Sequence, residues 1–159
     1  MVKLTHMEKT LSVSAIKHGT VIDHIPPGCA VTIIHLLKLL EHPNQVTVGL
    51  NLISGRMGLK DLIKIENRFL SEQEAHDIAV FAPNATLSII RNFQVEKKIE
   101  AQLPAVIEKL LVCPNLRCIT RHESVFSAFS VVEFRSKVNL RCKYCEKIFA
   151  REEIKEYRT

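Results

Sequence analysis

Two short cysteine pairs near the end of the sequence constrain the fold of this chain more than any other feature. Cys113 and Cys118 are separated by four residues, and Cys142 and Cys145 are separated by two. Two such hairpin loops can bring four thiolates to the corners of a tetrahedron, the arrangement that Zn²⁺ prefers with sulfur ligands. The spacing therefore predicts one structural Zn²⁺ ion per chain. Four cysteine ligands leave no open position for water or substrate, so catalysis by this metal is not expected.

Buried free thiols, a redox pair and an iron–sulfur site are the alternatives to zinc. Free thiols do not explain two pairs at this spacing, and a redox motif requires only one Cys-x-x-Cys pair. An iron ion in the same four-sulfur set is an alternative that the ligands alone leave open. The fifth cysteine, Cys29, lies in an apolar stretch and is expected to be a small core residue.

The composition places the chain among ordinary globular proteins. Hydrophobic residues make up 47% and charged residues 25% of the sequence, which excludes disordered and collagen-like architectures. The longest apolar run, from Cys29 to Leu40, is interrupted by His35 and Lys38 and is too short to span a bilayer. The first six residues lack the pattern of a secretory signal. The chain is therefore expected to be cytoplasmic, without membrane contact, and its thiols to be reduced rather than paired in disulfides.

The first hundred residues predict a ferredoxin-like domain, in which two helices cover one face of an antiparallel sheet. Alternating residues between turn signals predict strands at 19–25, 46–52, 60–66, 86–90 and 93–98. The second and third of these strands form a hairpin. A first helix is predicted from Cys29 to Glu41, and a capping box formed by Ser71 and Glu74 opens a second helix that ends near Phe81. The fold class is therefore α+β.

A charged stretch with a proline, residues 97–104, interrupts this pattern and predicts a domain boundary. Residues 1–103 form the ferredoxin-like domain in this interpretation, and residues 104–159 form a small β zinc-binding domain. The second segment is near the size that hydrophobic burial alone rarely stabilises, so a metal is expected to hold it together. Strands are predicted between the two cysteine pairs, at 125–134 and 136–141.

The sequence does not indicate an enzyme. It contains no Ser-His-Asp set, no glycine-rich phosphate loop before a helix and no His-Glu-x-x-His motif. The net charge of +5 suits a polyanionic partner without choosing among nucleotides, nucleic acids and acidic proteins. A zinc ribbon fused to an RNA-recognition sheet is one alternative, but such sheets carry stacking aromatics on their central strands, and residues 21–25 and 60–66 contain none. Nucleic acid is therefore not the expected partner.

Several polar residues fall where predicted strands end or cross. Asp23 and His24 end the first strand, Lys64 lies within the third, and Lys97 and Lys98 end the last. The first and third strands form the central pair of the predicted sheet, so Asp23 and Lys64 can come close. Such a set can bind a nucleotide, with the carboxylate on a hydroxyl or amine and the lysines on phosphate. It can equally be a surface ion pair at the edge of the sheet.

The sequence resembles the regulatory chain of aspartate carbamoyltransferase in the runs 21–26, 49–58, 60–67, 69–71, 111–115 and 142–147. The resemblance covers residues 11–150 in a single order and keeps both cysteine spacings. It implies a non-catalytic subunit of the first committed enzyme of pyrimidine synthesis, which binds CTP as inhibitor and ATP as activator. It also implies a homodimer of regulatory chains, and a zinc domain that docks on the catalytic chain, so that three regulatory dimers bridge two catalytic trimers.

The resemblance also implies roles for individual residues. In the nucleotide site, Val13 and Ile16 would line the base pocket, and Asp23 and Lys64 would hold the ribose. His24 and Lys98 would reach the phosphates. In the second domain, the zinc ligands are Cys113, Cys118, Cys142 and Cys145, and Asn115 faces the catalytic chain. The sequence departs from the family pattern at Ser14, Ser88 and Arg117, where an acidic residue and two asparagines are expected. These departures bear on nucleotide preference and on the catalytic contact.

Overall fold

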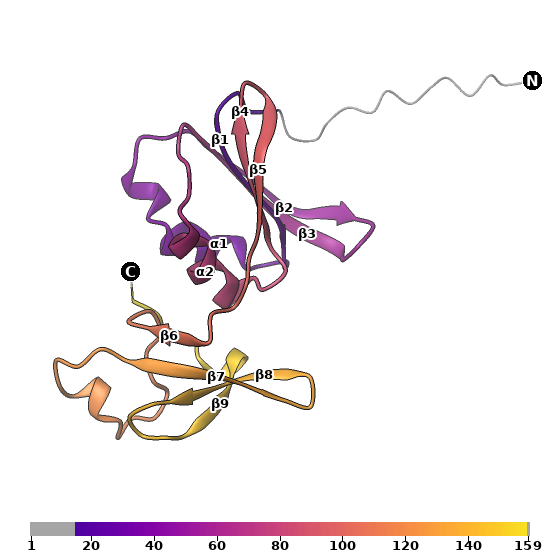
Figure 1. Cartoon of the computed structure of the whole chain (residues 1–159). Coiled ribbons are helices and arrows are strands. Elements are labelled where there is room, and N and C mark those ends of the chain that lie inside the picture. Colours follow the sequence, from indigo (N-terminus) through magenta and orange to yellow (C-terminus); the bar gives the residue numbers. More distant parts are fainter. Residues whose placement is uncertain (1–14, 159) are drawn as a thin grey trace, which may run out of the picture.

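The computed structural model describes residues 15–158, which form two sheets joined by a short connection (Figure 1). The first sheet is antiparallel and has the strand order β2-β3-β1-β4-β5. Its strands are β1 (Gly19–Ile25), β2 (Val46–Ser54), β3 (Gly58–Glu66), β4 (Thr86–Arg91) and β5 (Gln94–Glu100). Helices α1 (Ala30–Leu36) and α2 (Glu72–Phe81) both cover the same face. This arrangement confirms the α+β class and the ferredoxin-like sheet.

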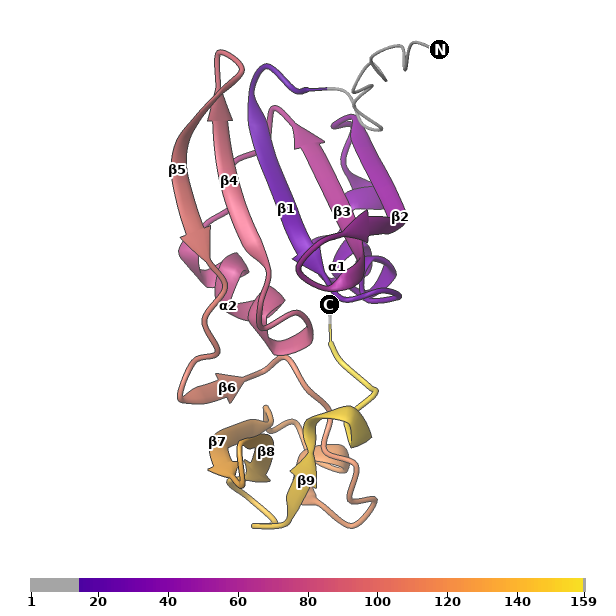
Figure 2. The ribbon, with the colours of Figure 1, turned by 90° about the vertical axis from the view of Figure 1, so that its right-hand side faces the viewer.

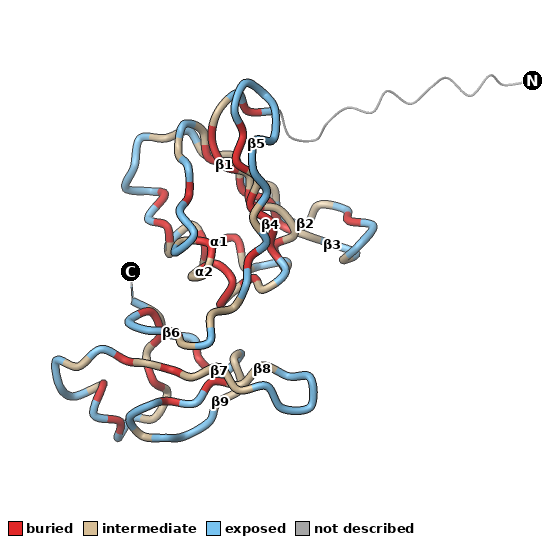
Figure 3. The backbone as a smooth tube through the Cα atoms, in the orientation of Figure 1, coloured by how far each residue is buried: buried red, intermediate tan, exposed pale blue. Residues whose placement is uncertain are grey.

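Alternation along the strands separates the two faces of this sheet. Ile22 on the central strand lies opposite Ile63 on one side and Leu87 on the other, and all three are fully buried under the helices. The neighbouring positions point to the face that carries no helix, and there the side chains are mostly polar and partly exposed. Strand β5 is exposed along most of its length, whereas β1 and β4 are largely buried (Figure 3).

The first helix is shorter than the sequence predicts. Helix α1 ends at Leu36, and a separate 3₁₀ turn, η1 (Leu39–Glu41), follows Lys38, whose φ of 51° is left-handed. This reversal of the backbone allows Leu39 to enter the core, while Leu40 stays 78% exposed. A continuous apolar run in the sequence does not reveal such a break, because the position of the break depends on where the hydrophobic core lies. The predicted single helix from 29 to 41 is therefore wrong in its extent.

The second helix begins where the capping box predicts. The hydroxyl of Ser71 accepts a hydrogen bond from the backbone N–H of Glu74 at 3.2 Å, and the Glu74 carboxylate accepts one from the N–H of Ser71 at 2.8 Å. Arg68 forms an ion pair with the same carboxylate at 2.8 Å. On the inner face of the helix, Ala75 and Ile78 are buried in the first core.

The second sheet has the order β6-β7-β8-β9, with strands β6 (Val106–Glu108), β7 (Ala128–Phe134), β8 (Lys137–Cys142) and β9 (Ile148–Ala150). Strands β7 and β8 correspond to the two that the sequence predicts. The three-residue strands β6 and β9 and the turns η2 (Ile119–Arg121) and η3 (Arg151–Glu153) are too short to produce a recognisable pattern. Residues 97–100, which the sequence analysis placed at the boundary, belong to β5 and lead down to β6 (Figure 2).

Each sheet has its own hydrophobic core, and α2 contributes to both. Its last residues, Val80 and Phe81, pack with the second core, as does Leu36 of α1. The ring of Phe81 meets Tyr157 edge to face, with 5.2 Å between the centroids. Tyr157 also forms an isolated antiparallel β-bridge with Leu111 of the second unit. Between residues 15 and 158, no helix is long and apolar enough to cross a membrane.

Candidate functional site

The structure brings the four cysteines of the two pairs together. Their sulfur atoms lie within 4.8 Å of one another, with 3.7 Å between Cys113 and Cys145 and 3.8 Å between Cys118 and Cys142. Tetrahedral coordination with metal–sulfur bonds of about 2.3 Å places sulfur atoms ~3.8 Å apart. All four thiols are free. The cluster therefore has the dimensions of a four-sulfur metal site.

Local hydrogen bonds shape the first cysteine loop. The backbone N–H of Cys118 donates to the carbonyl of Asn115 at 2.9 Å, which closes the loop. The guanidinium of Arg121 donates to the carbonyl of Cys113 at 2.8 Å. The hydroxyl of Thr120 lies 3.1 Å from the sulfur of Cys118. These contacts fix the positions of two sulfur atoms before any metal is considered.

Backbone contacts also form the second loop. Cys142 accepts from the N–H of Glu146 at 2.9 Å and donates to the carbonyl of Lys147 at 3.0 Å. Glu146 takes a left-handed conformation, with φ of 62°, that turns the chain back toward β9. The loop therefore presents Cys142 and Cys145 on one side, facing the first pair.

The four thiols do not share one electrostatic environment. Burial raises the pKa of the Cys113 and Cys142 thiols. Burial also raises the pKa of Cys145, but hydrogen bonds from the Asn115 side chain, the Lys147 N–H and neighbouring thiols outweigh it and lower the value to about 7. Because the thiolate is the metal-binding form, Cys145 is the ligand most nearly prepared in the metal-free chain. The Asn115 side chain is therefore one of the groups that lower the pKa of Cys145.

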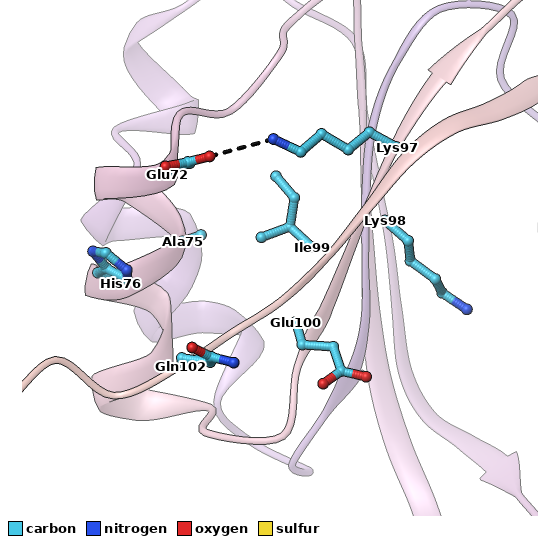
Figure 4. A pocket seen from close by; sticks show the side chains of 8 residues that line it. All are labelled: Glu72, Ala75, His76, Lys97, Lys98, Ile99, Glu100 and Gln102. Atoms are coloured by element: carbon cyan, nitrogen blue, oxygen red, sulfur yellow. Dashed lines mark hydrogen bonds and ion pairs between the residues drawn. The ribbon is translucent and has the colours of Figure 1, made fainter.

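The other predicted site residues gather on the helix-free face of the first sheet. Val21 lies opposite both Lys64 and Ser88, and Ser88 lies opposite Lys98. Directly opposed residues of antiparallel strands point to the same face, so these four residues form one row across β3, β1, β4 and β5. In Figure 4, Lys98 points away from α2, while its neighbour Lys97 points toward it. The row places two lysines on an open sheet surface.

At one end of this row, Asp23 forms an ion pair with a lysine that the sequence analysis did not select. The Lys60 ammonium lies 2.8 Å from the Asp23 carboxylate, and the N–H of His24 donates to that carboxylate at 2.7 Å. Burial raises the pKa of Asp23, but these hydrogen bonds and the charges of Lys60 and His24 outweigh it and lower the value. Burial lowers the pKa of Lys64, and the Asp23 charge partly opposes that shift. Lys60 and Lys64 are four residues apart on β3 and therefore lie on the same face of the strand. This spacing could have identified Lys60 as a candidate site residue together with Lys64.

The orientation of His24 follows from an irregularity in the sheet. The pairing of β1 with β3 shifts register between Ile22 and Ile25, and His24 has a left-handed φ of 56° at this bulge. Its Nδ1 lies 3.3 Å from the hydroxyl of Thr86 on β4. Regular alternation would have given His24 the opposite face from Asp23, so the bulge decides where the ring lies.

The remaining predicted residues lie beyond the other end of β1. Val13 and Ser14 fall outside the described residues. Ile16 is 5% exposed and precedes β1, and the next residue, Lys17, accepts a hydrogen bond from the N–H of Phe93 at 3.0 Å. This contact places the segment beside the turn between β4 and β5. Ile16 is thus at the opposite end of the strand from Asp23.

A buried carboxylate supports the loops around this surface. Asp61 is fully buried, and its oxygens accept hydrogen bonds from the N–H groups of Gly28 at 2.8 Å and Asn51 at 3.0 Å. It thereby links the loop after β1 to the bulge of β2. The sequence pattern does not predict this role, because a charged residue within a strand usually faces solvent.

A polar hollow of about 420 Å³ lies between α2 and β5, with an ion pair of 3.3 Å between Lys97 and Glu72 at its rim (Figure 4). His76 of α2 also contributes to its lining. The ammonium of Lys98 lies on the other side of the strand. Lys98 nevertheless contributes to the lining of the hollow, which therefore borders the row of predicted nucleotide-binding residues.

Comparisons with known proteins match most of the chain. A family model described as the allosteric domain of the aspartate carbamoyltransferase regulatory chain matches residues 11–102, and one described as its metal binding domain matches residues 105–155. Aspartate carbamoyltransferase regulatory chains of three bacteria are similar. The one from Chromobacterium violaceum is 49% identical over 152 residues, covering 96% of this chain and 100% of that one. Those from Photobacterium profundum and Photorhabdus laumondii are 48% and 52% identical, covering 94% and 89% of this chain and 97% and 92% of theirs.

Proposed function

Because the chain belongs to the family of aspartate carbamoyltransferase regulatory chains, we propose that it transmits nucleotide binding to the catalytic chain of that enzyme. It is a non-catalytic subunit with an allosteric domain and a metal-binding domain, and a catalytic chain is its partner. The finer assignments are CTP and ATP as effectors, Zn²⁺ as the metal, and a boundary between residues 103 and 104. The joint presence of a four-thiol cluster and a polar sheet face in one chain supports this function best.

In the proposed nucleotide site, the helix-free face of the first sheet receives CTP or ATP. Lys64 and Lys98 supply positive charge, and Asp23 supplies an acceptor for ribose hydroxyls. His24 reaches the phosphates with Lys98, and the base is assigned to Ile16 together with Val13, which lies outside the described residues. Lys60, which holds Asp23 at 2.8 Å, keeps that carboxylate ionised and oriented. The effector regulates only by binding two states of the enzyme with different affinity, typically a difference of about 1 to 3 kcal/mol.

Lys98 and Lys97 provide a matched test of this nucleotide site. Replacing Lys98 with glutamine should weaken binding of CTP and ATP roughly tenfold, because a charge-assisted phosphate contact is lost. Lys97→Gln makes the same charge change on the opposite face and should leave the affinity nearly unchanged. Isothermal titration calorimetry on the metal-loaded chain measures both. Equal losses in the two variants would contradict the assignment of the helix-free face.

In the proposed metal site, one Zn²⁺ is held by Cys113, Cys118, Cys142 and Cys145. The sulfur separations of 3.7 and 3.8 Å support tetrahedral coordination. Four thiolates satisfy Zn²⁺ completely, so the metal would stabilise the fold and would not take part in a reaction.

Two exposed apolar surfaces support the proposed assembly. The edge strand β2 carries Val48, Leu50 and Ile53, of which Ile53 is 92% exposed, and Leu59 on β3 lies opposite Ile53. We assign this edge to the homodimer of regulatory chains, because a bare apolar edge strand is a template for pairing with a second chain. Beside the cysteine loops, Leu116 is 71% exposed next to Asn115. We assign this second surface to the catalytic chain.

Mass measurement by light scattering tests the assembly. The metal-loaded chain mixed with catalytic trimers from the same source should form a particle of two trimers and six regulatory chains. Ile53→Asp should leave regulatory chains bound to single trimers without bridging, because it disrupts only the dimer edge. Leu116→Asp should instead leave trimers and regulatory dimers apart. A wild-type trimer that elutes beside unbound chain would overturn the proposed function.

A further inference from the structure

Arg151 is a half-buried cation whose Nε has no hydrogen-bond partner among the described residues. It begins the turn η3, and within residues 15–158 its Nε is a buried nitrogen to which no acceptor is bound. Buried donors almost always have partners in folded proteins, and a buried guanidinium without one is costly. Burial lowers the pKa of Arg151, but a guanidinium stays protonated at neutral pH. No described residue therefore accepts a hydrogen bond from this buried nitrogen, and an acceptor from outside the described chain could fill that position.

Arg151 lines two cavities, one at the contact between the two units and one within the second unit. A smaller cavity of about 120 Å³ is lined by Arg151 together with Val80 and Phe81 of α2. A larger cavity of about 360 Å³ is lined by Arg151 together with Ser136, Lys137 and Asn139. We call the larger one the Arg151 cavity. It combines a second cation with neutral hydrogen-bonding side chains around the unpartnered guanidinium.

The charges near Arg151 neutralise it only in part. Glu152 lines both cavities, yet among the described residues it forms no ion pair with Arg151. The nearby Cys29 carries a thiol whose pKa is raised by burial, so it is uncharged at neutral pH. A cavity with two cations and one carboxylate keeps a net attraction for an anion.

We propose that the Arg151 cavity binds a small oxyanion, a phosphate or carboxylate group, held by Arg151, Lys137, Ser136 and Asn139. Guanidinium groups bind such oxyanions through paired N–H donors, and the volume leaves room for a small molecule that carries the group. The cavity lies on the second sheet, whereas the proposed nucleotide residues lie on the first. An oxyanion bound here would neutralise a charge beside the last turn of α2 and so stabilise the contact between the units.

Nuclear magnetic resonance of arginine Nε–H groups in the metal-loaded full chain tests the proposal directly. The Arg151 signal is assigned by its loss in Arg151→Lys. Sodium phosphate and, separately, sodium acetate are titrated against sodium chloride at constant ionic strength. We expect a saturable shift of the Arg151 signal that chloride does not produce. The stronger of the two probes tells whether the natural ligand carries a phosphate or a carboxylate group. A shift that stays linear for both probes would overturn the proposal.

A melting experiment supplies a second readout. The effective probe should raise the melting temperature of the wild-type chain, because it binds only the folded form. Arg151→Gln should weaken this apparent affinity at least tenfold, whereas Arg56→Gln, the same change at an exposed arginine, should retain it. Lys98→Gln should also retain the effect, which separates this cavity from the proposed nucleotide site. An unchanged response in Arg151→Gln would count against the proposal.

Discussion

Two aspartates on neighbouring strands show how position decides the role of a carboxylate. Asp61 is fully buried and accepts backbone hydrogen bonds, so it fixes loop structure. Asp23 is partly exposed and pairs with Lys60, so it remains available to a ligand. The sequence predicted Asp23 as a site residue but neither its true ion-pair partner nor the role of Asp61. Both depend on the bulges in β1 and β2, which shift the register and which alternation cannot reveal.

Removing the charge of Lys60 should raise the pKa of Asp23. In Lys60→Gln the hydrogen bond and charge that lower it are weakened, while burial still raises it. In the wild type, the folded-state pKa lies below the unfolded value of about 3.9, so the pair stabilises the chain above that pH and this stabilisation is lost as the pH falls through the folded-state pKa. Carbon-detected titration of the Asp23 carboxylate measures the shift. Lys64→Gln should have the smaller effect, because the side-chain hydrogen bond that lowers the pKa of Asp23 comes from Lys60. An unchanged Asp23 pKa in Lys60→Gln would refute this account.

The two helices illustrate which elements a sequence reveals. The start of α2 is set by contacts between Ser71 and Glu74, three residues apart, so the local pattern is sufficient. The end of α1 is set by the burial of Leu39 in a core built from distant strands. The short strands β6 and β9 exist only because β7 and β8 lie beside them. Local signals therefore predicted the order of the main elements, and tertiary packing decided where several of them end.

Removing the cap of α2 should destabilise the first unit. Ser71→Ala deletes the hydroxyl that accepts from Glu74 N–H, and we expect a loss of about 1 kcal/mol in the free energy of unfolding. Urea unfolding followed by circular dichroism measures it. Gln73→Ala, at an exposed position of the same turn, is the matched control and should cost less. Equal effects of the two substitutions would show that the cap contributes nothing specific.

At the scale of the whole molecule, one helix connects two units that have separate cores. The cysteine spacing predicted that four thiols would meet, because each pair is local and only two loops had to be brought together. The contact between Phe81 and Tyr157 could not be predicted, since 76 residues separate the two rings in the sequence. Contacts of this kind depend on how two finished units fit against each other.

Metal removal should unfold the second unit and leave the first largely intact. Metal binding energy in a small unit of this kind is also folding energy, and the first sheet has a core of its own. Treating the chain with a mercurial and a chelator should therefore abolish the dispersed amide signals of residues 104–158 in nuclear magnetic resonance spectra, while those of β1 and β4 persist. The treated chain should also no longer bind catalytic trimers.

A pair of cysteine substitutions checks that this loss is specific. Cys145→Ser should reduce metal retention, whereas Cys29→Ser, outside the cluster, should retain it. If amides of the second unit stayed protected from exchange after the metal had left, the proposed dependence of folding on metal would be wrong.

The use of α2 by both cores has a consequence for the order of events during synthesis. Val80 and Phe81 pack in the second core, but they leave the ribosome well before the four clustered cysteines do. Domains generally fold from the N-terminus as they emerge. The first sheet can therefore be complete, with the end of α2 already formed as a docking surface, before Cys142 and Cys145 appear. The second unit then folds against a finished template, and metal capture becomes the last step of the chain's maturation.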